Sequence, residues 1–399
     1  MEIHLKIKEI AAAIYPEILA IRRHIHSNPE LSFEEFETSA YICGVLDQWG
    51  VSYKNGIAGT GIVAVLHGKN EGKTIAFRAD MDALPVTEMN TIPYKSKNDG
   101  KMHACGHDVH TSSLLGAVRI LSDLKEYWNG TIKFVFQPGE EKIPGGASLM
   151  IKEHALSPDE PEIILAQHVF PDMEAGNVGF RSGQYMASSD EIYITIKGKG
   201  GHAALPDKLV DPVLITAHLI TSLQQIVSRN AKPGTPTVLS FGKVEAAGAV
   251  NVIPDQVKIE GTFRTMNEEW RGKAHELIRK ISTDLCTSMG GSAEVEIRHG
   301  YPVLVNDPEV TQKAKEFAIQ FLGEKKVHEL DFRMTAEDFA YFAQKYPATL
   351  FRLGTSDPGQ QSSALHTSTF NVNENSIELS MGLLAFLGVS FLGESNDVK

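Results

Sequence analysis

Between residues 61 and 166, short apolar segments alternate with a longer segment of helical periodicity, and this alternation constrains the fold more than any other feature. Strands and one helix are predicted, in chain order, at 61–66, 74–78, 110–124 (the helix), 131–136 and 163–166. Strands that alternate with helices favour parallel pairing, because each crossover returns the chain to the same edge. We therefore predict an α/β fold whose mixed, largely parallel sheet carries helices on both faces.

The N-terminus is predicted to be helical, because isoleucines recur at helical spacing from Ile3 to Ile14. Pro16 is expected to begin a second helix, since proline is favoured in the first turn of a helix and disfavoured in its interior.

The order of predicted elements changes after residue 187. Strands and helices are expected at 191–197, 212–228 (helix), 237–241, 257–265, 268–289 (helix) and 293–298. The order β-α-β-β-α-β is that of a ferredoxin-like α+β unit. A chain of 399 residues is long enough for two domains. We expect a catalytic metal-binding domain at 1–186 and 302–399, and an inserted lid and dimerisation domain at 187–301.

Composition limits the partners and the compartment. The net charge of −12 argues against nucleic acid or an anionic membrane as a partner. The three cysteines cannot form a disulfide framework, no signal peptide is evident, and no run of about 18 apolar residues predicts a membrane helix. We expect a cytoplasmic protein without nucleic-acid or membrane partners.

Cysteine and histidine gather in one short segment, from Met102 to His110. Cys105 and His107 are two residues apart just before a predicted helix, and a loop lets both side chains converge on one metal ion. The alternative for this segment is a polar loop that caps the helix. His103 and His110, which flank the pair, are interpreted as supporting or capping residues.

Further ligand-type residues follow predicted strands. Glu140 and Glu141 come directly after the strand at 131–136, so one carboxylate can bind metal while the other faces a water molecule. His168 follows the strand at 163–166, and His366 lies near the C-terminus. Each has an ordinary alternative, a solvated loop end or a structural hydrogen bond. Their joint placement favours a site, because sites in α/β sheets gather at the carboxyl ends of strands.

The chain resembles metallopeptidase family 20, the aminoacylase and carboxypeptidase group. Within it, the chain is similar to the amidohydrolase branch of hippurate hydrolases, N-acyl-L-amino acid amidohydrolases and auxin-conjugate hydrolases. The matching motifs are Arg23-His24-Ile25-His26, Pro29-Glu30-Leu31, Arg78-Ala79-Asp80-Met81-Asp82-Ala83-Leu84-Pro85, 102–108, 136–141, 200–206, 251–254, 261–264, 336–339 and 365–367.

The resemblance implies two divalent metal ions bridged by the Cys105 thiolate. Glu141 and His366 would complete one site, and His107 and His168 the other. Relatives with a His-x-Asp motif place a metal-binding histidine at the position of Asp80, a role that His107 would take here.

The remaining roles implied by the resemblance concern catalysis and substrate. Glu140 would be the general acid and base, Asp82 a carboxylate supporting the metal ligands, and His202 an oxyanion donor reaching in from the partner of a homodimer. Asn251 and Arg264 would bind the free carboxylate of the substrate. The alternative for Arg264, which ends a predicted strand, is an ion pair with a surface carboxylate.

We therefore expect a metal-dependent amidohydrolase acting on small N-acyl amino acids, acetyl and benzoyl conjugates among them. Thiolate and imidazole ligands favour zinc, with manganese, cobalt or nickel as alternatives. A dipeptidase or carboxypeptidase would use the same metals. A cysteine hydrolase with Cys105 as nucleophile would leave Glu140, Glu141, His168 and His366 without a role, and a catalytically dead binding protein would not need Glu140.

Overall fold

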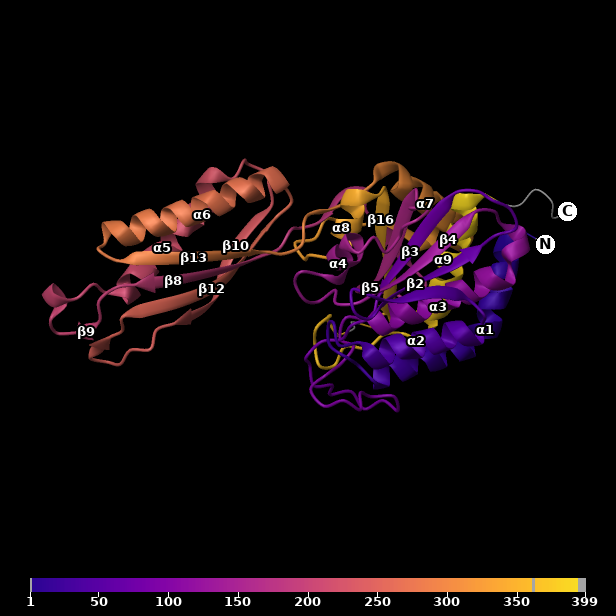
Figure 1. Ribbon diagram of the computed structural model, residues 1–399, viewed down its shortest axis with the longest axis horizontal. Coiled ribbons are helices and arrows are strands. Elements are labelled where there is room, and N and C mark those ends of the chain that lie inside the picture. The colour runs from indigo at the N-terminus through magenta and orange to yellow at the C-terminus, as the bar shows by residue number, and fades with distance from the viewer. Residues whose placement is uncertain (1, 361–362, 394–399) are drawn as a thin grey trace. The chain divides into compact units, whose positions relative to one another are not determined.

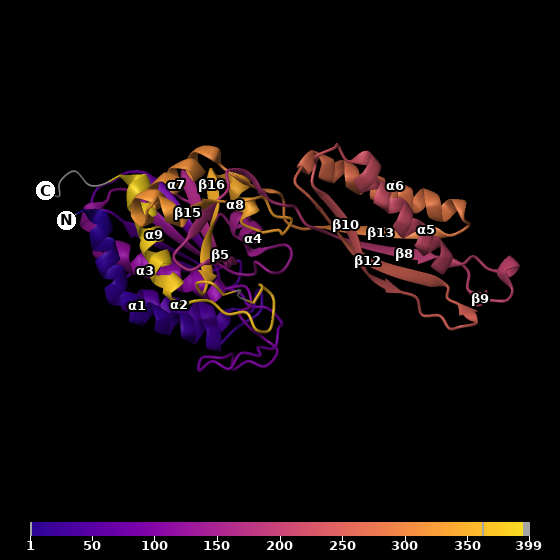
Figure 2. The same cartoon turned by 180° about the vertical axis from the view of Figure 1, so that it is seen from behind.

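The computed structural model describes residues 2–360 and 363–393, which fall into two compact units. The large unit is Met1–Tyr185, Val305–Asp331 and Asp338–Lys399, and the small unit is Met186–Leu304 and Phe332–Glu337. The sequence-based boundaries place 332–337 in the catalytic domain instead. That segment joins the small unit because the amide of Ala187 donates to the carbonyls of Arg333 (3.1 Å) and Thr335 (3.0 Å). Figures 1 and 2 show the two units from opposite sides.

One mixed sheet organises the large unit. Among the described residues it has eight strands in the order β1-β2-β4-β3-β5-β16-β6-β15, and β4, β3, β5 and β16 run parallel. The strands are β1 (Ser52–Ile57), β2 (Gly61–His67), β3 (Thr74–Asp80), β4 (Thr131–Gln137), β5 (Ile163–Glu174), β6 (Val178–Phe180), β15 (Val327–Glu329) and β16 (Ala348–Ser356). The predicted α/β class and largely parallel sheet are confirmed.

Helices cover both faces of this sheet. The two helical layers contain α1 (Ile3–Ser27), α2 (Phe36–Gln48), α3 (His107–Asp123), α7 (Pro308–Leu322) and α9 (Asn375–Leu392) on one face, and α4 (Gly146–Lys152) and α8 (Ala340–Lys345) on the other. Strand β4 shows why both faces are covered, since its successive side chains point to opposite faces of the sheet. Phe134 and Phe136 join the core beneath α3 and α9, whereas Lys133 donates to the carbonyls of Leu156 and Pro158, which follow α4.

The N-terminal segment is one helix, so the expected second helix at Pro16 was wrong. Helix α1 runs from Ile3 to Ser27 with Pro16 inside it. The fixed φ of proline is itself helical, and its ring removes only one main-chain hydrogen bond. The buried face continues on both sides of the proline, from Ile7 to Ile18, so packing against the core holds the helix together.

The small unit is built on an antiparallel sheet. Its strands are β8 (Asp190–Lys197), β10 (Thr237–Glu245), β12 (Gln256–Thr265) and β13 (Ser292–His299), paired in the order β10-β12-β8-β13. Helices α5 (Pro212–Gln225) and α6 (Glu268–Ser288) pack together over this sheet. The connection order β8-α5-β10-β12-α6-β13 is the ferredoxin-like one. The small unit also contains the short pair of β9 (Gly201–His202) with β11 (Val252–Ile253). A second short pair, β7 (Gly183–Met186) with β14 (Leu304–Asn306), belongs mostly to the large unit.

Helix α9 is, among the described residues, the one helix long and apolar enough by composition to cross a membrane. Glu378 and several serines interrupt the apolar residues of α9, so the sequence contains no unbroken apolar run there. In the structure 67% of this segment is buried, and α9 packs against α1, α3 and α7. That burial is the pattern of a core helix.

The contact between α3 and α9 depends on Gly116. A Cβ atom at Gly116 would lie 2.7 Å from Cβ and 2.6 Å from Sδ of Met381. We expect Gly116→Ala to lower the free energy of unfolding by about 1–3 kcal/mol, because the helices must move apart. Gly44→Ala in α2 is the matched control, since a Cβ there meets no atom within 4 Å and should stabilise the helix by about 0.5–1 kcal/mol. Thermal unfolding measures both, and equal shifts would contradict close packing at Gly116.

Candidate metal centre

The predicted site residues of the large unit gather at one edge of its parallel strands. Asp80 ends β3, Asp82 follows two residues later, and Glu140 and Glu141 follow the end of β4. His168 lies within β5, which continues to Glu174 rather than ending at residue 166 as predicted. The carboxyl ends of parallel strands meet at the same edge, so residues distant in sequence come together there.

A loop before α3 carries Cys105 and His107 to this edge. Gly106 between them has φ 80°, the left-handed region that favours glycine. A Cβ there would also lie 2.6 Å from Cγ2 of Val169, so the loop packs directly on β5. The amide of His366 donates to the carbonyl of Ala104 at 2.8 Å, which brings the C-terminal segment to the same loop.

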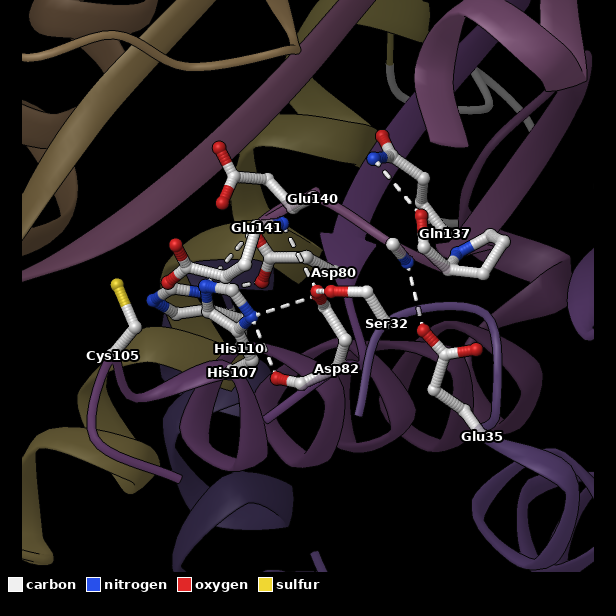
Figure 3. Close-up of polar contacts among 12 residues, drawn as sticks. Ser32, Glu35, Asp80, Asp82, Cys105, His107, His110, Gln137, Glu140 and Glu141 are labelled. Carbon is white, nitrogen blue, oxygen red and sulfur yellow. Dashed lines mark hydrogen bonds and ion pairs between the residues drawn. The ribbon is translucent and has the colours of Figure 1, made fainter. Parts of the chain in front are cut away.

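The structure brings all five predicted ligands together. Ligand atoms lie within 4.8 Å of one another in one group of Cys105, His107 and His168 and in a second group of Cys105, Glu141 and His366. Cys105 belongs to both groups. Figure 3 shows the side chains of Cys105, His107, Glu140 and Glu141 facing a common space.

The ligand atoms of these side chains fit a metal ion. Nδ1 of His107 lies 2.9 Å from the main-chain oxygen and 3.2 Å from Oδ1 of Asp82, so it carries the proton. Its Nε2 is buried, makes no hydrogen bond within the described part of the chain, and lies 3.7 Å from Oδ2 of Asp80. Nδ1 of His168 donates to the carbonyl of Val169 (2.8 Å), and its Nε2 lies 3.5 Å from Sγ of Cys105. Three imidazoles, a thiol and a carboxylate form the donor set that zinc prefers.

Burial governs the protonation of Cys105 and His168. Burial and the negative charge of Glu141 raise the pKa of the Cys105 thiol. A nearby cation is therefore needed to keep it as a thiolate at neutral pH. Burial, with the charges of Arg352 and His110, holds the pKa of His168 well below its usual value, so its imidazole is neutral and able to bind a metal. A nucleophilic cysteine needs a lowered pKa, so this environment argues against a cysteine hydrolase.

Asp82 links three parts of the site. Its Oδ2 accepts from Oγ of Ser32 (2.6 Å) and from the amide of Glu141 (3.0 Å), while its Oδ1 faces Nδ1 of His107. Burial would raise the pKa of Asp82, but the hydrogen bonds from His107 and Ser32 lower it. Asp82 therefore orients two of the candidate ligands.

Residues that the sequence did not single out also support the site. Glu35 accepts from the amide of Gly139, and Oγ of Ser32 donates to Asp82. Both lie next to the Pro29-Glu30-Leu31 motif, but nothing in their spacing reveals a partner about 50 to 100 residues away. His110, expected to have a supporting role, faces Oδ1 of Asp80 at 2.6 Å through Nδ1 and accepts from the amide of Val169 at 2.9 Å.

The other predicted site residues belong to the small unit. His202 in β9 pairs with Val252 of β11, and the amide of Ala203 donates to the carbonyl of Asn251 at 3.0 Å, so His202 and Asn251 are exposed neighbours. Arg264 lies near the end of β12 and donates to the carbonyl of Met334 at 3.2 Å. The small unit thus brings His202 and Asn251 together and places Arg264 elsewhere along its sheet.

Comparison with known proteins gives a consistent result. A family model described as Peptidase family M20/M25/M40 matches residues 76–387. N-acetyl-L-cysteine deacetylase of Bacillus subtilis is 37% identical over 90% of this chain and 85% of that protein. Thermostable carboxypeptidase 2 of Saccharolobus solfataricus is 35% identical over 98% and 99%, respectively. A solved dinuclear metal-binding peptidase of the M20 family from Bacillus subtilis has a TM-score of 0.82 and 32% identity, covering 96% of this chain and 99% of that one.

Because Cys105 belongs to both groups of candidate ligands, we predict that the metal content of the protein depends on it. We expect the chain to carry two divalent ions and Cys105→Ala to lose both sites, because both groups contain its sulfur. Cys43→Ala is the matched control, since Cys43 is buried to a similar extent in α2 and belongs to neither group. Metal analysis by mass spectrometry after dialysis measures the content. Full metal content in Cys105→Ala would contradict a bridging role.

Proposed function

Since this chain belongs to peptidase family M20/M25/M40, we propose that it hydrolyses N-acyl amino acids to a free amino acid and a carboxylic acid. Family membership confirms the resemblance found in the motifs and makes the chain a metal-dependent hydrolase of amide bonds. The relative named N-acetyl-L-cysteine deacetylase supports the choice of N-acyl amino acids as the substrate class.

One observation carries the proposal: five ligand-type side chains converge beside the buried carboxylate of Glu140. Cys105 with His107 and His168 would hold one ion, and Cys105 with Glu141 and His366 the other. Two such ions would polarise the scissile carbonyl and lower the pKa of a bound water. We assign zinc to the site because of its sulfur and nitrogen donors, with manganese, cobalt and nickel as alternatives.

Glu140 is assigned the proton transfers. Glu140, Glu141 and His107 each have a ligand-type atom within 4.8 Å of the other two, so the Glu140 carboxylate lies beside two proposed ligands. Its Oε1 also accepts a long hydrogen bond from the amide of Asp338 (3.4 Å). From this position Glu140 would take a proton from the attacking water and deliver it to the leaving amine nitrogen.

A carboxypeptidase activity is the second candidate. It is favoured by thermostable carboxypeptidase 2 of Saccharolobus solfataricus, which matches nearly the whole chain. The proton transfers by Glu140 would be the same, and only the group on the acyl side of the scissile bond differs. A substrate with a free α-amino group on the acyl side of the scissile bond would be a peptide.

The two glutamates and the two substrate classes are tested in one experiment. We expect the zinc-loaded enzyme to hydrolyse N-acetylmethionine faster than alanylmethionine and to lose activity on chelation. Glu140→Gln should keep its metals but lose about a hundred- to ten-thousand-fold in kcat, because an amide accepts no proton. Glu141→Gln is the matched control and should lose metal first. Near-normal turnover of Glu140→Gln would contradict its role, and preference for the dipeptide would favour the carboxypeptidase.

The small unit is proposed to be a lid and dimerisation domain that brings His202 to the partner subunit's metal centre. Three exposed apolar side chains lie on or close in sequence to the short β9–β11 pair that carries His202: Val252 is in β11, Val250 precedes it, and Leu205 follows His202 by three residues. An exposed apolar surface of this kind favours a protein contact, and a homodimer is the commonest assembly.

The other assignments to the small unit concern the substrate. Asn251, beside His202, and Arg264 would bind the substrate carboxylate, for which a guanidinium fork is suited. Burial lowers the pKa of Arg264 without removing its charge at neutral pH.

A cytoplasmic location is also proposed. Cys43, Cys105 and Cys286 are all free and buried, and a thiolate metal ligand needs a compartment in which thiols stay reduced.

The role of His202 predicts complementation between inactive subunits. We expect His202→Ala to keep its metals and fold but to lose about a hundred- to a thousand-fold in kcat, as for other oxyanion donors. Mixed with His107→Ala, it should regain part of the activity, since one site of the hybrid dimer would be complete. His218→Ala, at an exposed position of α5, is the matched control. A fully active monomer, or subunits that exchange but stay inactive, would contradict this role.

A further inference from the structure

The segment from Asn28 to Glu35, which we call the clamp segment, connects α1 and α2 and lies against the metal centre. Leu31 forms a parallel bridge with Ala83, and the amide of Ala83 donates to the carbonyl of Glu30 at 2.7 Å. These contacts place the clamp segment beside the chain that leaves β3. The side chains of Phe33 and Glu35 reach the turn that follows β4, and Ser32 is joined to this turn through Asp82.

Ser32 supports the part of this turn that follows Glu140. Its Oγ donates to Oδ2 of Asp82 at 2.6 Å, and the same oxygen accepts from the amide of Glu141 at 3.0 Å. The hydroxyl therefore fixes the carboxylate to which the main chain of Glu141 is bound.

Glu35 supports the part of the turn that precedes Glu140. Its side chain is fully buried, and its Oε1 accepts from the amides of Gly139 (2.8 Å) and Phe33 (2.9 Å). Its Oε2 accepts from Oγ1 of Thr60 at 2.7 Å. Figure 3 shows Glu35 and Ser32 on the same side of the turn that carries Glu140 and Glu141. A buried carboxylate with all these donors has little freedom to move.

The clamp segment and the turn also touch through carbon atoms. Gly139 has φ 57°, and a Cβ atom there would lie 2.4 Å from the ring of Phe33. Phe33 itself has φ 68°, a conformation that is strained for a residue with a large side chain. The close approach shows that the hydrogen bonds of Glu35 and Ser32 act on a tightly packed turn.

We propose that Glu35 and Ser32 are positioning residues that fix the direction of the Glu140 carboxylate. The residue before Glu140 is bound to Glu35, and the residue after it is bound through Asp82 to Ser32. The main chain of Glu140 is thus held on both sides by one short segment that contains no proposed metal ligand. The effect on catalysis rests on the proposed role of Glu140 as general base. The contacts between the clamp segment and the turn do not depend on that role.

The first test compares substitutions at Glu35 with a control in the same segment. Glu35→Ala removes the acceptor of the Gly139 amide, whereas Glu35→Gln keeps one carbonyl oxygen for it. Glu30→Ala is the matched control, because the Glu30 carboxylate accepts from the amides of Glu37 and Thr38 at the start of α2 and not from the turn. Ser32→Ala removes the support of Asp82.

Hydrogen exchange of the peptide that covers residues 137–142 is the readout that does not depend on activity. We expect faster exchange in Glu35→Ala and Ser32→Ala, and wild-type exchange in Glu35→Gln and Glu30→Ala. If exchange in this peptide is unchanged in Glu35→Ala, the clamp does not exist. If Glu35→Ala does not fold, the comparison of Ser32→Ala with Glu30→Ala decides, and equal exchange in those two variants would overturn the proposal.

Steady-state kinetics on N-acetylmethionine is the second readout. We expect kcat of Glu35→Ala to fall on the order of tenfold to a hundredfold with KM and metal content unchanged, because only the direction of the base is lost. Glu35→Gln should recover most of this loss. An unchanged kcat in Glu35→Ala, or a fall in kcat that follows a loss of metal, would overturn the positioning role. An inactive wild type would instead refute the proposed function and leave the exchange result standing.

Discussion

The buried carboxylate of Asp82 is the interaction on which the site depends. A carboxylate removed from water must be satisfied by donors, and here they come from three separate parts of the chain: Ser32, His107 and the amide of Glu141. Moving any of these segments would leave a charge buried and unsatisfied. The carboxylate of Asp82 therefore couples the clamp segment, the start of α3 at His107 and the turn after β4.

A second buried network, centred on Arg78 of β3, extends this coupling. Arg78 donates to Asp80, Asp338 and Gln137 at 2.7–2.8 Å, and Asp80 in turn faces His110. Burial would raise the pKa of Asp80, but the positive charge that His107 carries without a bound metal, and the charge of Arg78, hold it well below its usual range. The charge of Asp80 is thus compensated within the protein. The proposed metal ligands are supported by ionised, hydrogen-bonded groups that hold one geometry. A metal site requires this kind of pre-organisation.

The sequence was sufficient for features that depend on local pattern. Apolar segments located the central strands. Motif residues, together with His168 after a predicted strand, located the side chains that converge around Cys105. Features that depend on long-range packing were missed. Helix α1 continues through Pro16 because its buried face continues, and β5 extends past His168 because β16 pairs with it from residue 164 to residue 170. The roles of Ser32 and Glu35 follow from approaches of the chain that no local spacing encodes.

The central claim is that Cys105 joins two metal sites at the edge of the sheet. Anomalous diffraction from crystals grown with zinc, recorded on both sides of the zinc absorption edge, tests it most directly. The account predicts two peaks per chain, each about 2.3 Å from Sγ of Cys105. The first peak should also contact His107 and His168, and the second Glu141 and His366. A single peak, or two peaks of which neither contacts Cys105, would contradict it.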